Sequence, residues 1–304
     1  MNISRRTFIA QTALATAGGL AAPYIRGSNR AAEPPIVGTG AHRFEYVHDW
    51  LVPPEGMAWG DTHGVCQDSE GFIYVAHTVH GSSQRPEAIA VFDPEGKFVR
   101  AFGAEFRGGA HGLDIRREQG VEVLYHCDTA RNRVVKTSLR GEVLWEKAYP
   151  DDVPAYAAAR IKYTPTNVAF APDGDFFIGD GYGSHHLLKF SGDGDFLGEV
   201  GRAGGSGDGE INNPHGQWVD LRGAEPVLVV ADRGNRRLQT FTLDGRHLRT
   251  IKDETRLRMP CGFDVRGDLM VCPDLDSQVC LLDRDYNVIA QLGDGQSENG
   301  KVGS

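Results

Sequence analysis

The sequence predicts an all-β fold built from one repeated unit, and three observations support that prediction. Glycine accounts for 39 of the 304 residues, against a usual share of about 7%, which favours many tight turns. Beyond the N-terminal segment, only Val153 to Ile161 shows helical spacing of apolar residues. A phrase of four short apolar strands also recurs along the chain. Such repeats at about 40 to 55 residues are typical of a β-propeller of four-stranded blades.

Each repeat opens with a polar residue, then glycine or asparagine, and continues as an alternating apolar strand. The centres of these openings are His63, His111, Thr166, His215 and Cys261. An aspartate closes the second strand of most repeats, at Asp128, Asp180, Asp232 and Asp274. Because the openings begin the innermost strands of blades stacked around an axis, we expect His63, His111 and His215 to point into the central channel at one end.

Five full blades are predicted, at residues 55–105, 108–149, 162–202, 210–253 and 257–294. His42 to Val52 is predicted as one more strand, of the kind that completes a last blade and closes a ring. The polar, glycine-rich segment Gly293 to Ser304 offers no strands to join it. Two interpretations stay open. We favour a propeller of the six-bladed type that is truncated at its C-terminus over a five-bladed ring with an extra strand.

The N-terminal segment is predicted to be a twin-arginine signal peptide, residues 1–31, ahead of a propeller domain at 32–304. Arg5 and Arg6 precede a mildly apolar run from Ala13 to Ala22. That run is shorter than the ~20 residues that span a bilayer, which disfavours the alternative of a membrane anchor. We therefore expect export to the periplasm or cell surface, with no stable membrane insertion after signal cleavage.

The net charge excludes some classes of partner, and the cysteine content bears on possible disulfides. The chain has 32 Lys and Arg against 41 Asp and Glu, a net charge of −9, which argues against nucleic acid or an anionic membrane. A small-molecule or peptide substrate is the expected partner, and the sequence leaves the oligomeric state open. Of the five cysteines, Cys272 and Cys280 could pair across adjacent strands, although buried free thiols are favoured.

A family resemblance adds to this. Asp232 to Phe241, followed by Asp244-Gly245, resembles the NHL repeat. More specifically, Pro165 to Ile251 resembles the catalytic core of peptidyl-α-hydroxyglycine α-amidating lyase. The matching stretches are Pro165 to Phe170, Phe177 to Tyr182, Asn213 to His215 and Val230 to Gln239.

The resemblance implies a zinc ion held in the channel by three histidines, a calcium ion deeper on the axis, a tyrosine base and arginines for the substrate carboxylate. His111 and His215 match two zinc ligands, and Tyr182 matches the base. Arg233 matches one arginine, and the carbonyl of Leu113 matches a calcium ligand. The family's third zinc histidine belongs to a sixth blade.

His63 is the candidate that could take the third zinc position here. The chain also departs from the family's pattern: Thr78 stands where a first-blade arginine is expected. The family's disulfide cysteines are replaced too, by Gly183, Val229 and Thr240. These departures leave the substrate open.

The implied reaction is a zinc-dependent carbon–nitrogen cleavage. Three imidazoles leave zinc a free position for a substrate oxygen, and a tyrosine near a metal ion and an arginine gives up its proton more easily. Tyr182 would take the hydroxyl proton of an α-hydroxyglycine, the C–N bond would break, and an amide and glyoxylate would form. Arg233 would hold the carboxylate in a bidentate pair.

Two other function classes stay open. One is a non-catalytic NHL propeller that binds a protein or peptide. The other is a sugar-lactone hydrolase-like propeller centred on calcium, which is least favoured because the channel anchors are histidines. In the alternative interpretation, both side chains are purely structural: Tyr182 is an aromatic residue packed in a turn, and Arg233 braces neighbouring blades. The remaining histidines and three aspartates are expected to be loop, channel or turn residues: His77, His80, His126, His185, His186, Asp128, Asp180 and Asp232.

Overall fold

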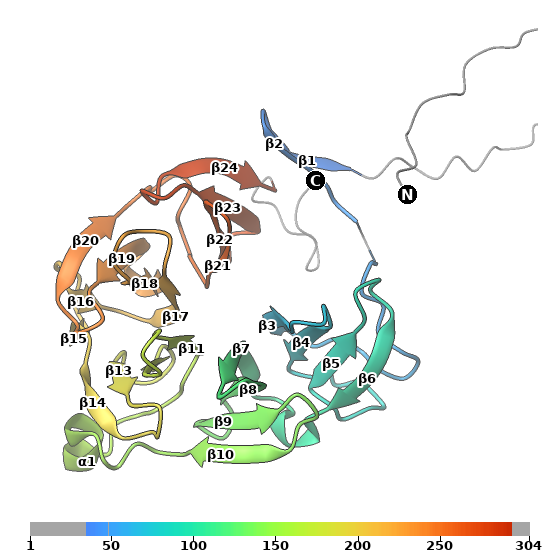
Figure 1. Ribbon diagram of the computed structural model, residues 1–304, viewed down its shortest axis with the longest axis horizontal. Coiled ribbons are helices and arrows are strands. Elements are labelled where there is room, and N and C mark those ends of the chain that lie inside the picture. Colours follow the sequence, from blue (N-terminus) through green and yellow to red (C-terminus); the bar gives the residue numbers. More distant parts are fainter. Residues whose placement is uncertain (1–34, 48, 294–304) are drawn as a thin grey trace, which may run out of the picture. The chain divides into compact units, whose positions relative to one another are not determined.

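The described residues of the computed structural model, 35–47 and 49–293, are nearly all β structure. They form a β-propeller in which five four-stranded blades follow one another around a ring (Figure 1). Each blade falls inside the range predicted for it, so the fold prediction is confirmed. The predicted signal peptide lies outside the described residues, and within them no helix is long and apolar enough to cross a membrane.

Within each blade the strands run antiparallel and in sequence order. The first blade contains β3 (Thr62–Gln67), β4 (Ile73–His77), β5 (Ile89–Phe92) and β6 (Phe98–Phe102). The 3₁₀ turn η1 (Ala104–Phe106) leads to the second, made of β7 (Ala110–Glu118), β8 (Val121–Asp128), β9 (Arg133–Ser138) and β10 (Val143–Lys147). Helix α1 (Pro154–Ala159) precedes the third, made of β11 (Asn167–Phe170), β12 (Phe176–Gly179), β13 (Leu187–Phe190) and β14 (Phe196–Glu199).

The last two blades complete the set. A short parallel pair, β15 (Arg202–Ala203) and β16 (Glu210–Ile211), leads to the fourth blade. That blade contains β17 (Pro214–Asp220), β18 (Val227–Asp232), β19 (Arg237–Phe241) and β20 (His247–Ile251), with the 3₁₀ turn η2 (Arg233–Asn235) between β18 and β19. The fifth blade contains β21 (Asp264–Arg266), β22 (Leu269–Asp274), β23 (Gln278–Leu282) and β24 (Val288–Leu292).

A glycine beside the opening residue of three repeats lets the innermost strands approach closely. A Cβ on Gly64 would meet the backbone nitrogen of Leu113 in the next blade at 2.5 Å. A Cβ on Gly112 would collide with the Thr166 carbonyl, and one on Gly216 with the Cys261 carbonyl. The backbones of successive blades therefore touch at the level of the histidines, which sets how far apart those histidines lie.

The apolar cores lie between successive blades. Tyr125 of β8 packs against Phe170 of β11 with ring centroids 4.9 Å apart, and both belong to one buried cluster with Phe176 of β12. A second cluster joins β12 to β18 through Phe177 and Val230. The second to fourth blades thus bury their faces against one another, as the repeat predicts.

The predicted strand at His42 to Val52 is wrong in extent and partner. Strand β2 covers only His42–Glu45 and pairs with β1 (Ile36–Thr39) in a two-stranded hairpin. The turn at Gly40, with φ of 59°, folds β2 back onto β1, the strand just before it. Gly38 of this hairpin lies against the Leu292 side chain of β24. The single predicted helix is confirmed as α1.

Candidate active site

The repeat openings bring their histidines to one end of a central cavity of about 1540 Å³. His63 lies on β3, His111 on β7 and His215 on β17, and all three line the cavity. Tyr182, from the turn after β12, and Arg233, from η2, line it as well. The structure therefore brings together the five side chains that the sequence assigned to catalysis and zinc.

The rings of these residues touch one another. The His111 ring stacks on His63 with centroids 4.2 Å apart and lies 4.9 Å from the His215 ring. The Tyr182 hydroxyl is 2.9 Å from His215 Nε2 and 3.3 Å from His111 Nε2. Two imidazole nitrogens thus converge on a single oxygen.

Backbone carbonyls fix the tautomers of two of these histidines. His111 Nδ1 lies 2.7 Å from the Thr166 carbonyl oxygen, and His215 Nδ1 lies 2.8 Å from that of Cys261. A carbonyl oxygen can only accept, so each Nδ1 carries the proton and each Nε2 presents a lone pair. The Tyr182 hydroxyl has one proton and can satisfy only one of them. The geometry therefore leaves an electron-rich point facing the cavity.

Burial keeps the imidazoles neutral. It lowers the pKa of His111 to about 3, with the neighbouring His63 adding to the effect. The pKa of His215 is also well below its usual value, first through burial and then through the Arg233 charge. Burial lowers the pKa of His63 in the same direction. All three are therefore available as lone-pair donors at neutral pH.

This donor set fits a metal ion through two of its members. Neutral imidazoles with Nε2 exposed and Nδ1–H on a backbone carbonyl are the usual form of metal-binding histidines. His63 differs because it stacks face to face on His111 at 21°. In the ranges that the structure describes, no group of three His, Cys, Asp or Glu side chains has the spacing of a metal site.

The Tyr182 turn is held from two sides. The Tyr182 backbone N–H donates to the Thr164 carbonyl at 3.3 Å, and Lys162 Nζ donates to the Tyr182 carbonyl at 2.6 Å. Asp180, at the start of the turn, accepts a 2.6 Å hydrogen bond from the Tyr156 hydroxyl of α1. The one helix of the described propeller thus positions the tyrosine that faces the histidines.

Arg233 is nearly buried and lacks an acidic partner. Its side chain is 9% exposed, and its guanidinium lies 5.3 Å from the centre of the Tyr182 ring. Its Nη1 lies 3.9 Å from Cys261 Sγ. Among the described residues no carboxylate forms an ion pair with it. A buried cation facing a cavity without a counter-ion is suited to an anionic ligand.

Leu113, the predicted calcium ligand, is buried in β7 and lines the same cavity. Its neighbour Asp114 was not predicted from the sequence; its carboxylate accepts a 2.8 Å hydrogen bond from Asn167. Burial raises the pKa of Asp114 to about 7, and Asp264 contributes in the same direction. Only the alternation of β7, which turns a carboxylate inward after Leu113, could have indicated it.

The expectation of loop or channel positions is wrong for His77 and His126, which lie buried in strands β4 and β8 because their rings pack against Trp59 and Phe106. Asp128 and Asp232 each pair with an arginine five residues later, at 3.2 Å to Arg133 and 2.6 Å to Arg237. His80 lines the cavity, and His185 accepts a hydrogen bond from the Asn213 backbone N–H. His186 lies 2.8 Å from a Glu199 carboxylate oxygen. Cys272 and Cys280 face each other across β22 and β23 as free, buried thiols.

Comparison with known proteins places this site in context. A probable peptidyl-α-hydroxyglycine α-amidating lyase of Caenorhabditis elegans is 28% identical over 164 residues, 51% of this chain and 43% of that protein. Peptidyl-α-hydroxyglycine α-amidating lyase 1 of Drosophila melanogaster is 27% identical over 222 residues, which cover 64% of this chain and 40% of that protein. The chain resembles amidating lyases. Its matches span less than half the length of these curated relatives.

Other comparisons add breadth. Peptidyl-glycine α-amidating monooxygenase B of Xenopus laevis is 30% identical over 176 residues, 55% of this chain and 19% of that protein. No protein-family model matches. Among solved structures, a streptogramin B lyase has a TM-score of 0.54 at 14% identity, covering 76% of this chain and 68% of that one. A chain of a nidogen–laminin complex has a TM-score of 0.56 at 15% identity, covering 76% and 79%. At that identity these structures show the propeller fold alone.

Proposed function

We propose that this protein is a carbon–nitrogen lyase that cleaves a peptidyl-α-hydroxyglycine or a close carboxylated relative, giving an amide and glyoxylate. The observation that carries the proposal is the convergence of His111 Nε2 and His215 Nε2 on the Tyr182 hydroxyl, with the unpaired Arg233 guanidinium over the tyrosine ring. The similarity to amidating lyases supports the same chemistry. The proposal extends to a zinc cofactor and to a calcium ion near the Leu113 carbonyl.

Zinc would be held by His111 and His215 through the two nitrogens that now face the hydroxyl. Their proton-bearing Nδ1 atoms, fixed on the Thr166 and Cys261 carbonyls, keep both Nε2 lone pairs aimed at one point. When bound, zinc supplies Lewis-acid polarisation of an oxygen ligand. His63 would complete the set after a change of ring orientation.

The protein's own residues would bind and move the proton. Arg233 holds the substrate carboxylate, which replaces the ion-pair partner that the guanidinium lacks. Tyr182 acts as the base that accepts the proton of the substrate hydroxyl. The oxygen lone pair forms the aldehyde C=O, the C–N electron pair passes to nitrogen, and nitrogen takes up a proton to become the amide. Charges and atoms balance without an oxidant.

The test is glyoxylate release from a peptide ending in α-hydroxyglycine, using purified protein supplied with zinc. We expect release that chelation abolishes and zinc restores. Tyr182→Phe should lower kcat by about 10²- to 10⁴-fold, the usual contribution of a positioned base. Tyr286→Phe, which removes a hydroxyl that bonds Asp220 and does not line the cavity, is the matched control and should retain the rate.

A second pair of variants tests the carboxylate contact. Arg233→Gln should raise KM strongly and Arg236→Gln should not, because Arg236 is exposed and does not line the cavity. No glyoxylate from the wild-type protein with zinc would contradict the lyase and favour a propeller that only binds peptides. Export by the twin-arginine pathway is a separate proposal, testable by replacing Arg5 and Arg6 with lysine and locating the protein.

A further inference from the structure

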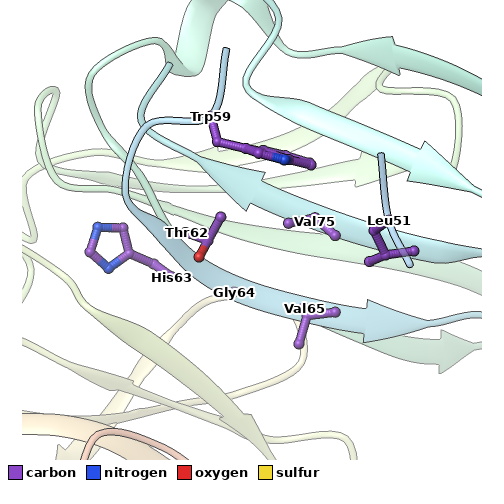
Figure 2. Close-up of a pocket in the computed structure, with 7 residues that line it drawn as sticks. All are labelled: Leu51, Trp59, Thr62, His63, Gly64, Val65 and Val75. Atoms are coloured by element: carbon purple, nitrogen blue, oxygen red, sulfur yellow. The ribbon is translucent and has the colours of Figure 1, made fainter. Parts of the chain in front are cut away.

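A second hollow adjoins the histidine cluster on the first blade. It has a volume of about 390 Å³ and is lined by Leu51, Trp59, Thr62, His63, Gly64, Val65 and Val75 (Figure 2). Figure 2 shows the Trp59 ring on one side, Val65 on the other, and Leu51 at the end away from His63. That volume is at the lower end of the roughly 300–1,000 Å³ common for ligand sites.

The walls of the hollow are apolar and already in place. The Trp59 ring packs edge-on against His77 at 4.8 Å and lies 6.0 Å from Phe92, so its position is fixed by the blade. Val75 belongs to the buried core of the blade, whereas Val65 is 65% exposed. A large exposed valine opposite a fixed tryptophan presents apolar surface that a ligand could cover.

The hollow is continuous with the candidate active site. Trp59, Thr62, His63, Gly64 and Val65 line both the hollow and the central cavity. The His63 ring, at their junction, stacks on His111 at 4.2 Å. A ligand held at the histidine cluster therefore has an apolar recess one side chain away.

We propose that this hollow binds the side chain of the residue that precedes the hydroxyglycine, and that it selects aromatic and large aliphatic side chains there. The proposal rests on the proposed function, which sets the substrate carboxylate on Arg233 and its hydroxyl at the histidines. Consecutive α-carbons are about 3.8 Å apart, so the preceding residue falls on the next wall of the cavity. Trp59 and Val65 form that wall on the His63 side.

The experiment measures binding, so it does not depend on turnover. Isothermal titration with two peptides that end in glycine and lack the reactive hydroxyl, acetyl-Phe-Gly and acetyl-Ala-Gly, reports the side-chain preference alone. We expect the phenylalanine peptide to bind at least about tenfold more tightly, as burial of an aromatic side chain predicts.

Matched variants locate the preference. Val65→Trp fills the hollow from an exposed strand position and should reduce the preference for the phenylalanine peptide to within about twofold. Val99→Trp makes the same change at a 47% exposed position of β6 and should keep the preference. Thermal unfolding of both variants checks that the fold is retained.

Each outcome is decisive. Equal affinities for the two peptides, a preference that survives Val65→Trp, or no binding of either peptide would overturn the inference. If glyoxylate release is also present, the proposed function stands without this pocket. If the preference is observed and Val65→Trp removes it but no glyoxylate is released, the pocket stands and the reaction is wrong.

Discussion

The second to fourth blades differ from the first and fifth in how their innermost strands are covered. One residue of β7 and none of β17 is exposed, whereas most residues of β3 and β21 are exposed. The glycines of the repeat openings set the fifth blade alone apart. A Cβ on Gly64, Gly112 or Gly216 would collide with the next blade, while a Cβ on Gly262 meets nothing within 4 Å among the described residues.

The difference bears directly on the site. His111 and His215 each anchor Nδ1 on a carbonyl of the following blade, Thr166 and Cys261. His63 stacks on His111, and in the described part of the chain its ring has no hydrogen bond. A channel histidine is therefore fixed in orientation where the next blade supplies a backbone carbonyl within hydrogen-bond distance of its Nδ1.

The largest expected effect is on the free energy of unfolding, where a substitution on the covered strand β11 is compared with one on the exposed strand β3. Val168→Asp on β11 introduces a carboxylate at a 3% exposed position, and we expect it to cost more than about 4 kcal/mol and to prevent stable folding. Val65→Asp on β3 should change the free energy of unfolding by less than about 0.5 kcal/mol. Urea unfolding followed by tryptophan fluorescence measures both. Equal losses would show that β3 is covered in solution.

The glycine pair gives an intermediate effect. Gly216→Ala forces the fourth and fifth blades apart and should cost about 1–3 kcal/mol, the usual penalty of overpacking. Gly262→Ala should lie within about 0.5 kcal/mol of the wild type, since the added methyl meets open space. The same unfolding assay applies. A large loss in Gly262→Ala would place a neighbour against the fifth blade.

The smallest effect is a pH dependence from a covered histidine. Burial lowers the pKa of His126 to about 3, while an unfolded histidine has a pKa of about 6.5. The unfolded state therefore binds more protons between these values, so stability is full above pH 6.5 and falls as the pH drops towards 3.

Between pH 7 and pH 5.5, the free energy of unfolding of the wild type should fall by about 1 kcal/mol more than that of His126→Gln. Melting temperatures across this pH range compare the two proteins. An unchanged profile in His126→Gln would mean that His126 is already charged in the fold.

Much of this arrangement follows from the repeat, because a fixed period puts equivalent residues at equivalent heights. That is why His63, His111 and His215 could be placed in one channel from spacing alone. The hairpin of β1 and β2 could not, because its partner choice depends on the turn at Gly40 and not on a period. Nor could Asp114 or the two carbonyls, whose roles arise from contacts between blades that no local pattern encodes.

The backbone carbonyls that hold the imidazoles belong to different blades from the imidazoles themselves. The separation between His111 Nε2 and His215 Nε2 is therefore governed by the spacing of three successive sheets, and not by any one loop. A change deep in a blade interface, such as an enlarged apolar side chain, would alter the span between the two donors without touching either. The convergence of these two nitrogens should accordingly respond to substitutions far from the cavity, through the radius of the ring.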